Sequence, residues 1–478
     1  MTFVNAIKNQ ETQTENGMRA RKSTANANVD LFFKIGASRG RNIIPEFISA
    51  FVENPETAIR IAMWARDVRG GAGERQLFRD ILSNLQTNRP DVARILMHKI
   101  PEIGRWDDLL TFNGILQTEA FTMIQKALEN KNGLCAKWMP RQGVNAIALR
   151  NFLGWSPKRY RKTLVTLTKV VETQMCAQDW DDIEFAEVPS VAAARYKKAF
   201  NRHTLKFAEY VEKLTKGESK VNAGAVYPYD VLKGVAGMDA TELKHVIAQW
   251  DALPNYVGDA SIFPLVDVSG SMESPAGKNK NITCMDISVS LGLYLSDKNK
   301  GVFNGAFLTF SSYPELLHLQ GNIVQKMAQM KDSKWGYSTN LNKALDLMLN
   351  TAVKGNVVQS EMPQTLLILS DMQFDADNSG WDDTAKSLIG RKYSAAGYNM
   401  PNIVFWNLSA SYENVPVKFD ELGVAMVSGF SPVIMKAVLA ADFDKFTPEA
   451  IMNEAIMIDR YNWLPMQVDT IKQSKALI

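Results

Sequence analysis

IFPLVDVSGS, residues 262–271, decides the fold of the C-terminal half of the chain. An apolar run of strand length ends there in an acidic turn, which is typical of the carboxyl end of a buried parallel strand. TLLILSD, residues 365–371, repeats this pattern, and the string GYSTNL places Thr339 just before a predicted helix. Because the carboxyl ends of parallel strands meet at one edge of a sheet, we expect these three loops to converge.

The three loops carry oxygen-bearing side chains suited to one metal ion. Carboxylates and hydroxyls are the ligands that hard cations such as Mg²⁺ prefer, and neither His nor Cys is needed. The pattern therefore predicts a Mg²⁺ or Mn²⁺ site. The alternative is a set of turn and helix N-cap residues without an ion, because Ser, Thr and Asp favour both places. The predicted metal ligands are Asp267, Ser269, Ser271, Thr339 and Asp371.

The order of these residues, DxSxS followed by a Thr and then an Asp, resembles the metal-ion-dependent adhesion site of von Willebrand factor A domains. All five positions match. Two of the three pieces follow a predicted strand, and the Thr precedes a predicted helix. The resemblance implies a von Willebrand factor A-like domain, which we place at residues 258–478.

The rest of the C-terminal half has the pattern of such a domain. Apolar strands alternate there with helices, which favours a doubly wound parallel sheet. Strands are expected at residues 262–266, 304–309, 365–369, 402–406 and 424–427. Helices are expected at residues 283–296, 323–330, 341–349, 384–396 and 432–439.

Length and composition are those of an ordinary multidomain protein. The 478 residues exceed the size at which one core keeps growing, and 46% hydrophobic with 22% charged residues is typical of globular domains. No apolar run reaches the roughly 18 residues that a membrane span needs, and the polar start lacks the apolar core of a signal peptide. Three scattered cysteines and four unclustered histidines predict neither disulfides nor a zinc site. We expect a cytoplasmic protein with no membrane partner.

The N-terminal half has helical periodicity. We expect a flexible terminus at residues 1–17 and a helical domain at residues 18–257. Amphipathic stretches broken by Gly, Pro and Asn predict stacked helix pairs, as in a HEAT-like solenoid or ring, although no strict sequence period is present. Helices are expected at residues 58–68, from Glu74 onward, and at 91–100, 118–129, 143–152, 157–175, 190–215 and 240–249.

Positive charge gathers in the middle of the chain. Residues 131–220 contain 17 Lys and Arg against 9 Asp and Glu, in a chain whose net charge is +3. Ser156 as N-cap and Pro157 at the first helical position would place four cations in the opening turns of a helix, where they oppose the helix dipole. A second basic stripe follows one face of the predicted helix at 190–215. An anionic partner would offset these charges, which favours RNA; the alternative is a pair of solvated basic faces.

The candidate RNA contacts on these two segments are Lys137, Arg141, Lys158, Arg159, Arg161, Lys162, Arg195, Lys198 and Arg202. Trp138, Trp155 and Tyr160 lie among them and are candidates for stacking on bases. The alternative is that these aromatic rings belong to the helical core, as we expect for the nearby Phe200 and Phe207.

Several long strings resemble the TROVE module of the Ro ribonucleoproteins. They are TENGMRARKSTANANVDLFFKIGASRG, AIRIAMWARDVRGGAGERQLFRDIL and IPEIGRWDDLL. AKWMPRQG, SPKRYRK, VPSVAAARYKKAF and VYPYD are similar to an uncharacterised TROVE-related group of plants and phages. The resemblance implies a helical ring closed by the von Willebrand domain. It also implies binding of small non-coding RNA on the outer basic surface and of single-stranded 3′ ends in the centre.

Three functions follow as alternatives. The first is an RNA-binding ribonucleoprotein scaffold that uses its metal site for a partner carboxylate. The second is a protein-assembly module without RNA. The third is a metal-dependent hydrolase, for which Asp375 and Asp377 are the only clustered carboxylates near Asp371. Because no Ser/His/Asp or Cys/His arrangement accompanies them, we expect a binding protein and no enzyme.

Overall fold

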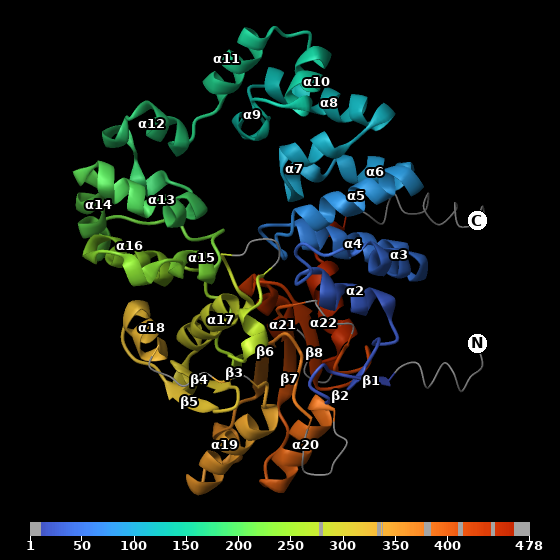
Figure 1. Cartoon of the computed structure of the whole chain (residues 1–478), viewed down its shortest axis with the longest axis vertical. Helices are drawn as coiled ribbons and strands as arrows, with labels where there is room; N and C mark the ends of the chain where they lie inside the picture. Colours follow the sequence, from blue (N-terminus) through green and yellow to red (C-terminus); the bar gives the residue numbers. More distant parts are fainter. Residues whose placement is uncertain are drawn as a thin grey trace.

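The computed structural model describes residues 11–276, 281–331, 336, 338–376, 384–409, 414–440 and 445–462. It has a helical N-terminal region and a C-terminal α/β region (Figure 1). The helical region ends with α16 (Ala240–Asp251), and the sheet begins with β3 (Ile262–Asp267). The order of a helical region followed by an α/β region is the one that the sequence predicts. No helix in the described ranges has both the length and the apolarity to cross a bilayer.

The α/β region is built on a six-stranded sheet of order β5-β4-β3-β6-β7-β8. The apolar runs predict its parallel core, because β3 and β6 are buried at every residue and so carry no polar alternation. The sheet is not wholly parallel, however, since β5 pairs antiparallel with β4 at the edge. Besides β3, the strands are β4 (Ala306–Phe310), β5 (Glu315–His318), β6 (Thr365–Ser370), β7 (Asn402–Asn407) and β8 (Val424–Ser428).

Helices cover both faces of the sheet. One core joins α17, α18, α21 and α22 to Val266, Leu369 and Trp406, and continues without a break into the helical region. A second core packs α19 and α20 against Leu265 and Ile368 on the opposite face. The bounds are α17 (Cys284–Lys298), α18 (Ile323–Lys331), α19 (Leu341–Lys354), α20 (Ala385–Ala395), α21 (Met435–Ala440) and α22 (Pro448–Ile456).

The expectation of a flexible terminus up to residue 17 is wrong for residues 11–17. A β-hairpin of β1 (Glu11–Gln13) and β2 (Arg19–Arg21) begins the described chain and packs on the α/β region. Met18 is buried in the core beneath α19 and α20, and the backbone groups of Arg21 and Val415 exchange hydrogen bonds of 2.9 and 2.8 Å. Buried backbone pairing and one apolar anchor order a segment whose composition is mostly polar. Residues 1–10 lie outside the described ranges.

The helical region contains more breaks than the periodicity predicts. Thr168 has an extended backbone, so the helix expected at 157–175 is divided into α11 and α12. Thr204 is also extended, and its hydroxyl caps α14 by accepting from the Lys206 N–H at 3.2 Å, which divides the helix expected at 190–215. A side chain that satisfies helix-end N–H groups favours such a break.

The helices before α16 are α2 (Ala27–Ile35), α3 (Ile44–Glu53), α4 (Pro55–Arg66), α5 (Gln76–Asn88), α6 (Pro90–Met97), α7 (Ile100–Ile103), α8 (Gly114–Glu129), α9 (Gly133–Trp138), α10 (Val144–Phe152), α11 (Pro157–Leu167), α12 (Val171–Ala177), α13 (Ser190–His203), α14 (Leu205–Thr215) and α15 (Pro228–Leu232).

These helices follow an arc whose two ends both pack on the α/β region (Figure 1). At the first end α2 contacts β8 and α4 contacts α22; at the second α15 contacts α17 and α16 contacts α18. The ends also touch each other, because the Tyr227 hydroxyl donates to the carbonyl of Ala72 at 3.0 Å. Gly73 makes this approach possible, since a Cβ there would lie 2.1 Å from the Tyr227 hydroxyl oxygen. The chain therefore closes on itself as a ring.

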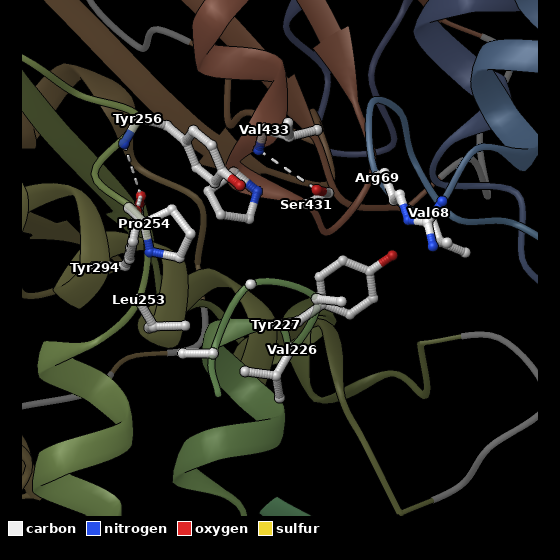
Figure 2. Close-up of a pocket in the computed structure, with 14 residues that line it drawn as sticks. Val68, Arg69, Val226, Tyr227, Leu253, Pro254, Tyr256, Tyr294, Ser431 and Val433 are labelled. Atoms are coloured by element: carbon white, nitrogen blue, oxygen red, sulfur yellow. Dashed lines mark hydrogen bonds between the residues drawn. The ribbon is translucent and has the colours of Figure 1, made fainter. Parts of the chain in front are cut away.

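The joint of the ring is tightly packed. Figure 2 shows Tyr227 of the helical region, Val433 of the α/β region and Arg69 of the first arm around one small cavity. The cavity volume is about 20 Å³, which is room for about one water molecule. This joint is therefore a structural contact rather than a ligand site.

Lys197, on α13, gives a stability prediction. Its side chain is 2% exposed, its Nζ donates to the Ala194 carbonyl at 2.8 Å, and burial lowers its pKa to about 8. Between that value and the unfolded pKa near 10.4, the unfolded chain binds a proton that the folded chain lacks, so stability rises with pH through this window. At pH 7 the full cost of burying the charge, about 3 kcal/mol, is present.

We therefore expect Lys197→Met to melt at a higher temperature than wild type at pH 7, and to lose most of this advantage by about pH 10. The matched control is Lys198→Met, on the exposed neighbouring residue, which should melt within about a degree of wild type. Thermal melts at the two pH values measure both effects. A Lys197→Met protein that is less stable than wild type at pH 7 would contradict the prediction.

Candidate metal centre and basic surface

The two predicted carboxylate ligands lie at the same edge of the sheet. β3 and β6 are parallel neighbours with Val266 opposite Leu369; Asp267 is the last residue of β3, and Asp371 directly follows β6. The chain order of the sheet reverses between these two strands, because β4 lies beyond β3 and β7 beyond β6. Ligands of open α/β sheets bind at such a switch point, outside the carboxyl ends of the strands.

The hydroxyl ligands join the two carboxylates through short contacts. The Ser269 N–H donates to Asp267 Oδ1 at 3.0 Å, and the Ser269 and Ser271 hydroxyl oxygens lie 3.2 Å apart. The Ser271 hydroxyl in turn hydrogen-bonds the Asp371 carboxylate. The structure therefore brings four of the five predicted ligands into one hydrogen-bonded group.

Thr339 reaches this group through the loop after β6. Its N–H donates to Asp375 Oδ1 at 3.2 Å, and the Asp375 N–H donates to the Thr339 carbonyl at 3.0 Å. The Asp375 carboxylate thus holds the Thr339 loop in place. Asp377, the other carboxylate considered for hydrolysis, lies outside the described residues.

The two carboxylates are buried without a compensating cation. Asp267 is 0% and Asp371 3% exposed, and neither forms an ion pair within the described ranges. Burial, and then the negative charge of Asp371, raise the pKa of Asp267 to about 7. Burial likewise raises the pKa of Asp371. Buried like charges are costly unless a cation or a proton joins them, so the site has the electrostatics of a cation site.

The donor set fits a hard divalent cation. It offers two carboxylates and three hydroxyls, and the described part of the chain holds no cluster of three or more His, Cys, Asp and Glu side chains arranged for a metal. Soft ligands that select zinc or copper are therefore not gathered here. Asp267, Ser269, Ser271, Thr339 and Asp371 are the residues that would hold the ion.

Two further residues support the centre, and the motif does not include them. The Ser370 hydroxyl donates to Asp267 Oδ2 at 2.5 Å, so both oxygens of Asp267 are oriented by the chain. The Gln373 N–H donates to Asp371 Oδ1 at 3.1 Å. Supporting hydrogen bonds of this kind fix the orientation of metal ligands. Ser370 is adjacent to Asp371 in sequence, and this adjacency is the only local signal for its role.

The first basic segment forms an exposed surface on α11. The Ser156 hydroxyl accepts from the Arg159 N–H at 3.2 Å, and Pro157 opens the helix, as predicted. Tyr160 turns inward and donates its hydroxyl to the Pro140 carbonyl at 3.0 Å, so this ring belongs to the core. The remaining residues of this turn are exposed and form no ion pair within the described ranges: Lys158, Arg159, Arg161 and Lys162. We call these four residues the α11 basic surface.

Aromatic rings next to this surface are partly open. Trp155 is half-buried, and the Arg159 guanidinium lies 4.8 Å from its ring centroid. Trp138 on α9 is also half-buried, with the Arg105 guanidinium 3.5 Å and the Lys137 ammonium 5.3 Å from its ring. A cation over an indole ring is attracted by the ring electrons. The rings and cations together form a flat, positively charged surface on which nucleic-acid bases can stack.

The Arg141 side chain forms hydrogen bonds within the chain that the sequence does not indicate. Its guanidinium donates to the carbonyls of Ala136 and Met139 at 2.9 and 2.5 Å and to the Thr168 hydroxyl at 3.1 Å. These contacts cap the end of α9 and tie it to the end of α11. Three donors of Arg141 are thereby used within the chain.

The second basic segment lies on α13. Arg195, Lys198 and Arg202 are exposed there, and Lys198 donates to the Gly237 carbonyl at 3.1 Å. Phe200 and Phe207 are buried in a separate small core, which confirms the core interpretation of these rings. This stripe lies on a different helix from the α11 basic surface, beyond α12 along the arc (Figure 1).

Comparisons with known proteins follow the same division of the chain. A family model described as "Domain of unknown function (DUF2828)" matches residues 14–105 and 156–260, and "Domain of unknown function (DUF7788)" matches residues 261–468. Among solved structures, the Deinococcus radiodurans RO (RSR) protein aligns over 90% of this chain and 99% of its own, with 12% identity and a TM-score of 0.44.

A protein of Acanthamoeba polyphaga mimivirus, "Uncharacterized protein L728", is similar along nearly the whole chain. It is 30% identical over 507 aligned residues, which cover 92% of this chain and 86% of the mimivirus protein. The alignment therefore includes both the helical ring and the α/β region. The chain belongs to the family of mimivirus protein L728.

Proposed function

We propose that this protein is a non-catalytic RNA-binding scaffold whose α/β region holds a Mg²⁺ or Mn²⁺ ion for a protein partner. The α11 basic surface carries the RNA part of the proposal. Four exposed cations within five residues, free of ion pairs in the described ranges, oppose the dipole of their own helix. Such a surface is stabilised by phosphate groups, and the neighbouring tryptophans offer stacking faces.

The sequence resemblance to the TROVE module supports the same assignment. In that module RNA binds to a helical ring, and here the helices also form a ring that closes on an α/β region. Small non-coding RNA or single-stranded 3′ ends are the RNA class that the resemblance favours. Lys137, Arg195, Lys198 and Arg202 extend the proposed contacts beyond the α11 basic surface.

The metal part of the proposal has support of its own. Asp267 and Asp371 are buried, neither is paired with Lys, Arg or His among the described residues, and the surrounding donors are hydroxyls. A bound Mg²⁺ would neutralise these carboxylates and retain affinity for a carboxylate from outside the centre. This observation also favours a second candidate function, a protein-assembly module that recruits an acidic partner and binds no RNA.

Ultraviolet absorbance of freshly purified protein distinguishes the two functions. For the RNA scaffold, we expect the ratio of absorbance at 260 nm to that at 280 nm to exceed the ratio for protein alone. It should fall to that value after ribonuclease treatment in 1 M salt, because salt releases phosphate contacts. A ratio that is already that of protein alone, together with no binding of added single-stranded RNA at low salt, would favour the assembly module.

A further inference from the structure

Two neighbouring carboxylates, Asp107 and Asp108, hold three arginine side chains from three parts of the helical region. Asp108 is fully buried, and it accepts from Arg66 Nε at 2.8 Å and from Arg79 Nε at 2.7 Å. Asp107 accepts from Arg105 Nε at 2.8 Å, and its Oδ2 also lies 2.8 Å from Arg79 Nη2. The three guanidinium groups therefore have fixed positions around two carboxylates.

Arg75 is a fourth arginine at this place, and it has no carboxylate of its own. It precedes α5 in a helical conformation, and the Arg79 N–H donates to its carbonyl at 3.2 Å, so the two side chains share one face. The Arg75 side chain is exposed and forms no ion pair or hydrogen bond within the described ranges. Partial burial, and then the like charges of Arg105 and Arg79, lower its pKa. We call Arg66, Arg75, Arg79 and Arg105 the arginine group.

The Arg105 guanidinium also lies over an aromatic ring. It is 3.5 Å from the ring centroid of Trp138 on α9, and the Lys137 ammonium is 5.3 Å from the same centroid. Lys137 forms no ion pair in the part of the chain that the structure describes. The pairing with Asp107 and the contact with Trp138 together restrict Arg105, so a ligand would meet a guanidinium that is already oriented.

The elements that carry these side chains pack against one another and reach the α11 basic surface. The short helix η1 (Trp106–Thr111) contacts α5 and α9, and α9 contacts α11. The Tyr160 hydroxyl of α11 donates to the carbonyl of Pro140, two residues after Trp138. Helices α5, α9 and α11 follow in this order along the arc (Figure 1). The arginine group and the α11 basic surface are therefore joined through α9.

The charge at this place is suited to phosphate. Four guanidinium groups share two carboxylates, and Lys137 adds a further cation. Like charges held together repel each other unless an ion of opposite sign joins them. Guanidinium groups in fixed orientations bind phosphate oxygens through paired N–H groups. An internal ion-pair network would be complete without Arg75, so this residue indicates an anion from outside the chain.

We propose that Arg75 and Arg105 form a second phosphate-binding site for RNA, distinct from the α11 basic surface, and that one strand runs from α11 over α9 to this site. The inference rests on the RNA-binding function proposed above. Lys137 and Trp138 lie between the two sites and contact the strand on its way. RNA is favoured over an acidic protein because the arginine group continues a surface that already offers cations and tryptophans.

Fluorescence anisotropy of the full-length chain with a labelled single-stranded RNA tests the inference. We expect Arg75→Gln to weaken binding about threefold at 50 mM salt and to make the slope of log affinity against log salt shallower by about 0.7, the loss of one phosphate contact. The matched control is Arg69→Gln, at another exposed arginine of the α4–α5 connection that forms no ion pair within the described ranges. It should leave the affinity and the slope unchanged.

Photo-crosslinking locates the strand directly. RNA that contains iodouracil is irradiated on the protein, and the crosslinked peptides are identified by mass spectrometry. We expect a crosslink in the peptide that contains Trp138, with a yield that falls several-fold in Arg75→Gln and is unchanged in Arg69→Gln. No crosslink to this peptide from RNA that is bound to wild type would overturn the proposed path.

The outcomes separate this inference from the RNA-binding function itself. If wild type does not bind RNA, both fall together. If wild type binds RNA and Arg75→Gln binds it equally well, or if Arg69→Gln loses as much affinity as Arg75→Gln, the second site is excluded while RNA binding stands. If Arg75→Gln weakens binding of polyglutamate but not of RNA, the arginine group is a site for an acidic protein, and the inference is wrong. Thermal melts confirm that the variants are folded.

Discussion

Replacing Lys158, Arg159, Arg161 and Lys162 together by Gln is expected to weaken binding of single-stranded RNA about a hundredfold at 50 mM salt. Each phosphate contact releases condensed counterions, and for single strands it contributes about 0.7 to the slope of log affinity against log salt. Four lost contacts should therefore make this slope shallower by about 3. Fluorescence anisotropy with a labelled oligonucleotide at several salt concentrations measures both quantities.

The control for this variant removes the same charge from the other region. Lys343, Lys354, Lys418 and Lys436 are exposed on the α/β region, and their joint replacement by Gln lowers the net charge by the same amount. If general positive charge attracts the RNA, both variants lose affinity equally. If the α11 basic surface binds it, only the first variant does. If the affinity and the salt slope of the first variant are unchanged, this surface is not the RNA site, and the protein-assembly function is favoured.

The sheet could be predicted because a strand that is buried on both faces appears in the sequence as a continuous apolar run. β3 and β6 have neighbours on both sides and helices on both faces, so both strands are buried at every residue and contain the apolar runs IFPLV and LLIL. β5 lies at the edge, where its residues alternate between half-buried and exposed, and Glu315–His318 contains no apolar run to detect. The predicted sheet therefore lacks the antiparallel edge strand, whereas its parallel strands agree with the structure within two residues at each end.

α22 begins with a recognisable sequence signal, although it is not among the predicted helices. Thr447 caps this helix by accepting from the Ala450 N–H at 3.1 Å, and Pro448 occupies its first turn. A capping Thr followed by Pro is a helix start that can be recognised in sequence. Breaks inside the long predicted helices at 157–175 and 190–215 are harder to recognise, because Thr168 and Thr204 are compatible with either a helix or a break.

The meeting of the two candidate carboxylate ligands could be predicted, since Asp267 and Asp371 stand at the carboxyl ends of parallel strands. Their supports could not, because the contacts cross the chain. Gln373 links Asp371 to Glu15, and no periodicity connects residues 358 positions apart. The same limit applies to Arg141. The sequence does not distinguish it from the other basic residues, but its guanidinium donates hydrogen bonds to backbone carbonyls at the end of α9. Only the fold distinguishes an available cation from a structural one.

Asp267→Ala is expected to abolish Mg²⁺ binding, with affinity reduced more than about a hundredfold. The substitution removes one of the two carboxylates among the five candidate ligands, the one whose two oxygens are held by Ser269 and Ser370. Calorimetry with Mg²⁺ measures the loss directly. The control is Glu273→Ala, which deletes an exposed carboxylate from the same loop and should leave the affinity unchanged. Equal Mg²⁺ binding by wild type and Asp267→Ala would exclude the centre.

Thermal stability gives an independent measurement of the same loss. A ligand that binds only the folded chain stabilises it by about 2.7 kcal/mol at a concentration 100 times its dissociation constant. Mg²⁺ should therefore raise the melting temperature of wild type, of Glu273→Ala and of the α11 variant alike, because the basic surface and the metal centre lie on different elements. The melting temperature of Asp267→Ala should not respond. A rise of equal size in Asp267→Ala would mean that Mg²⁺ stabilises the chain elsewhere, and the buried carboxylates would then need another explanation.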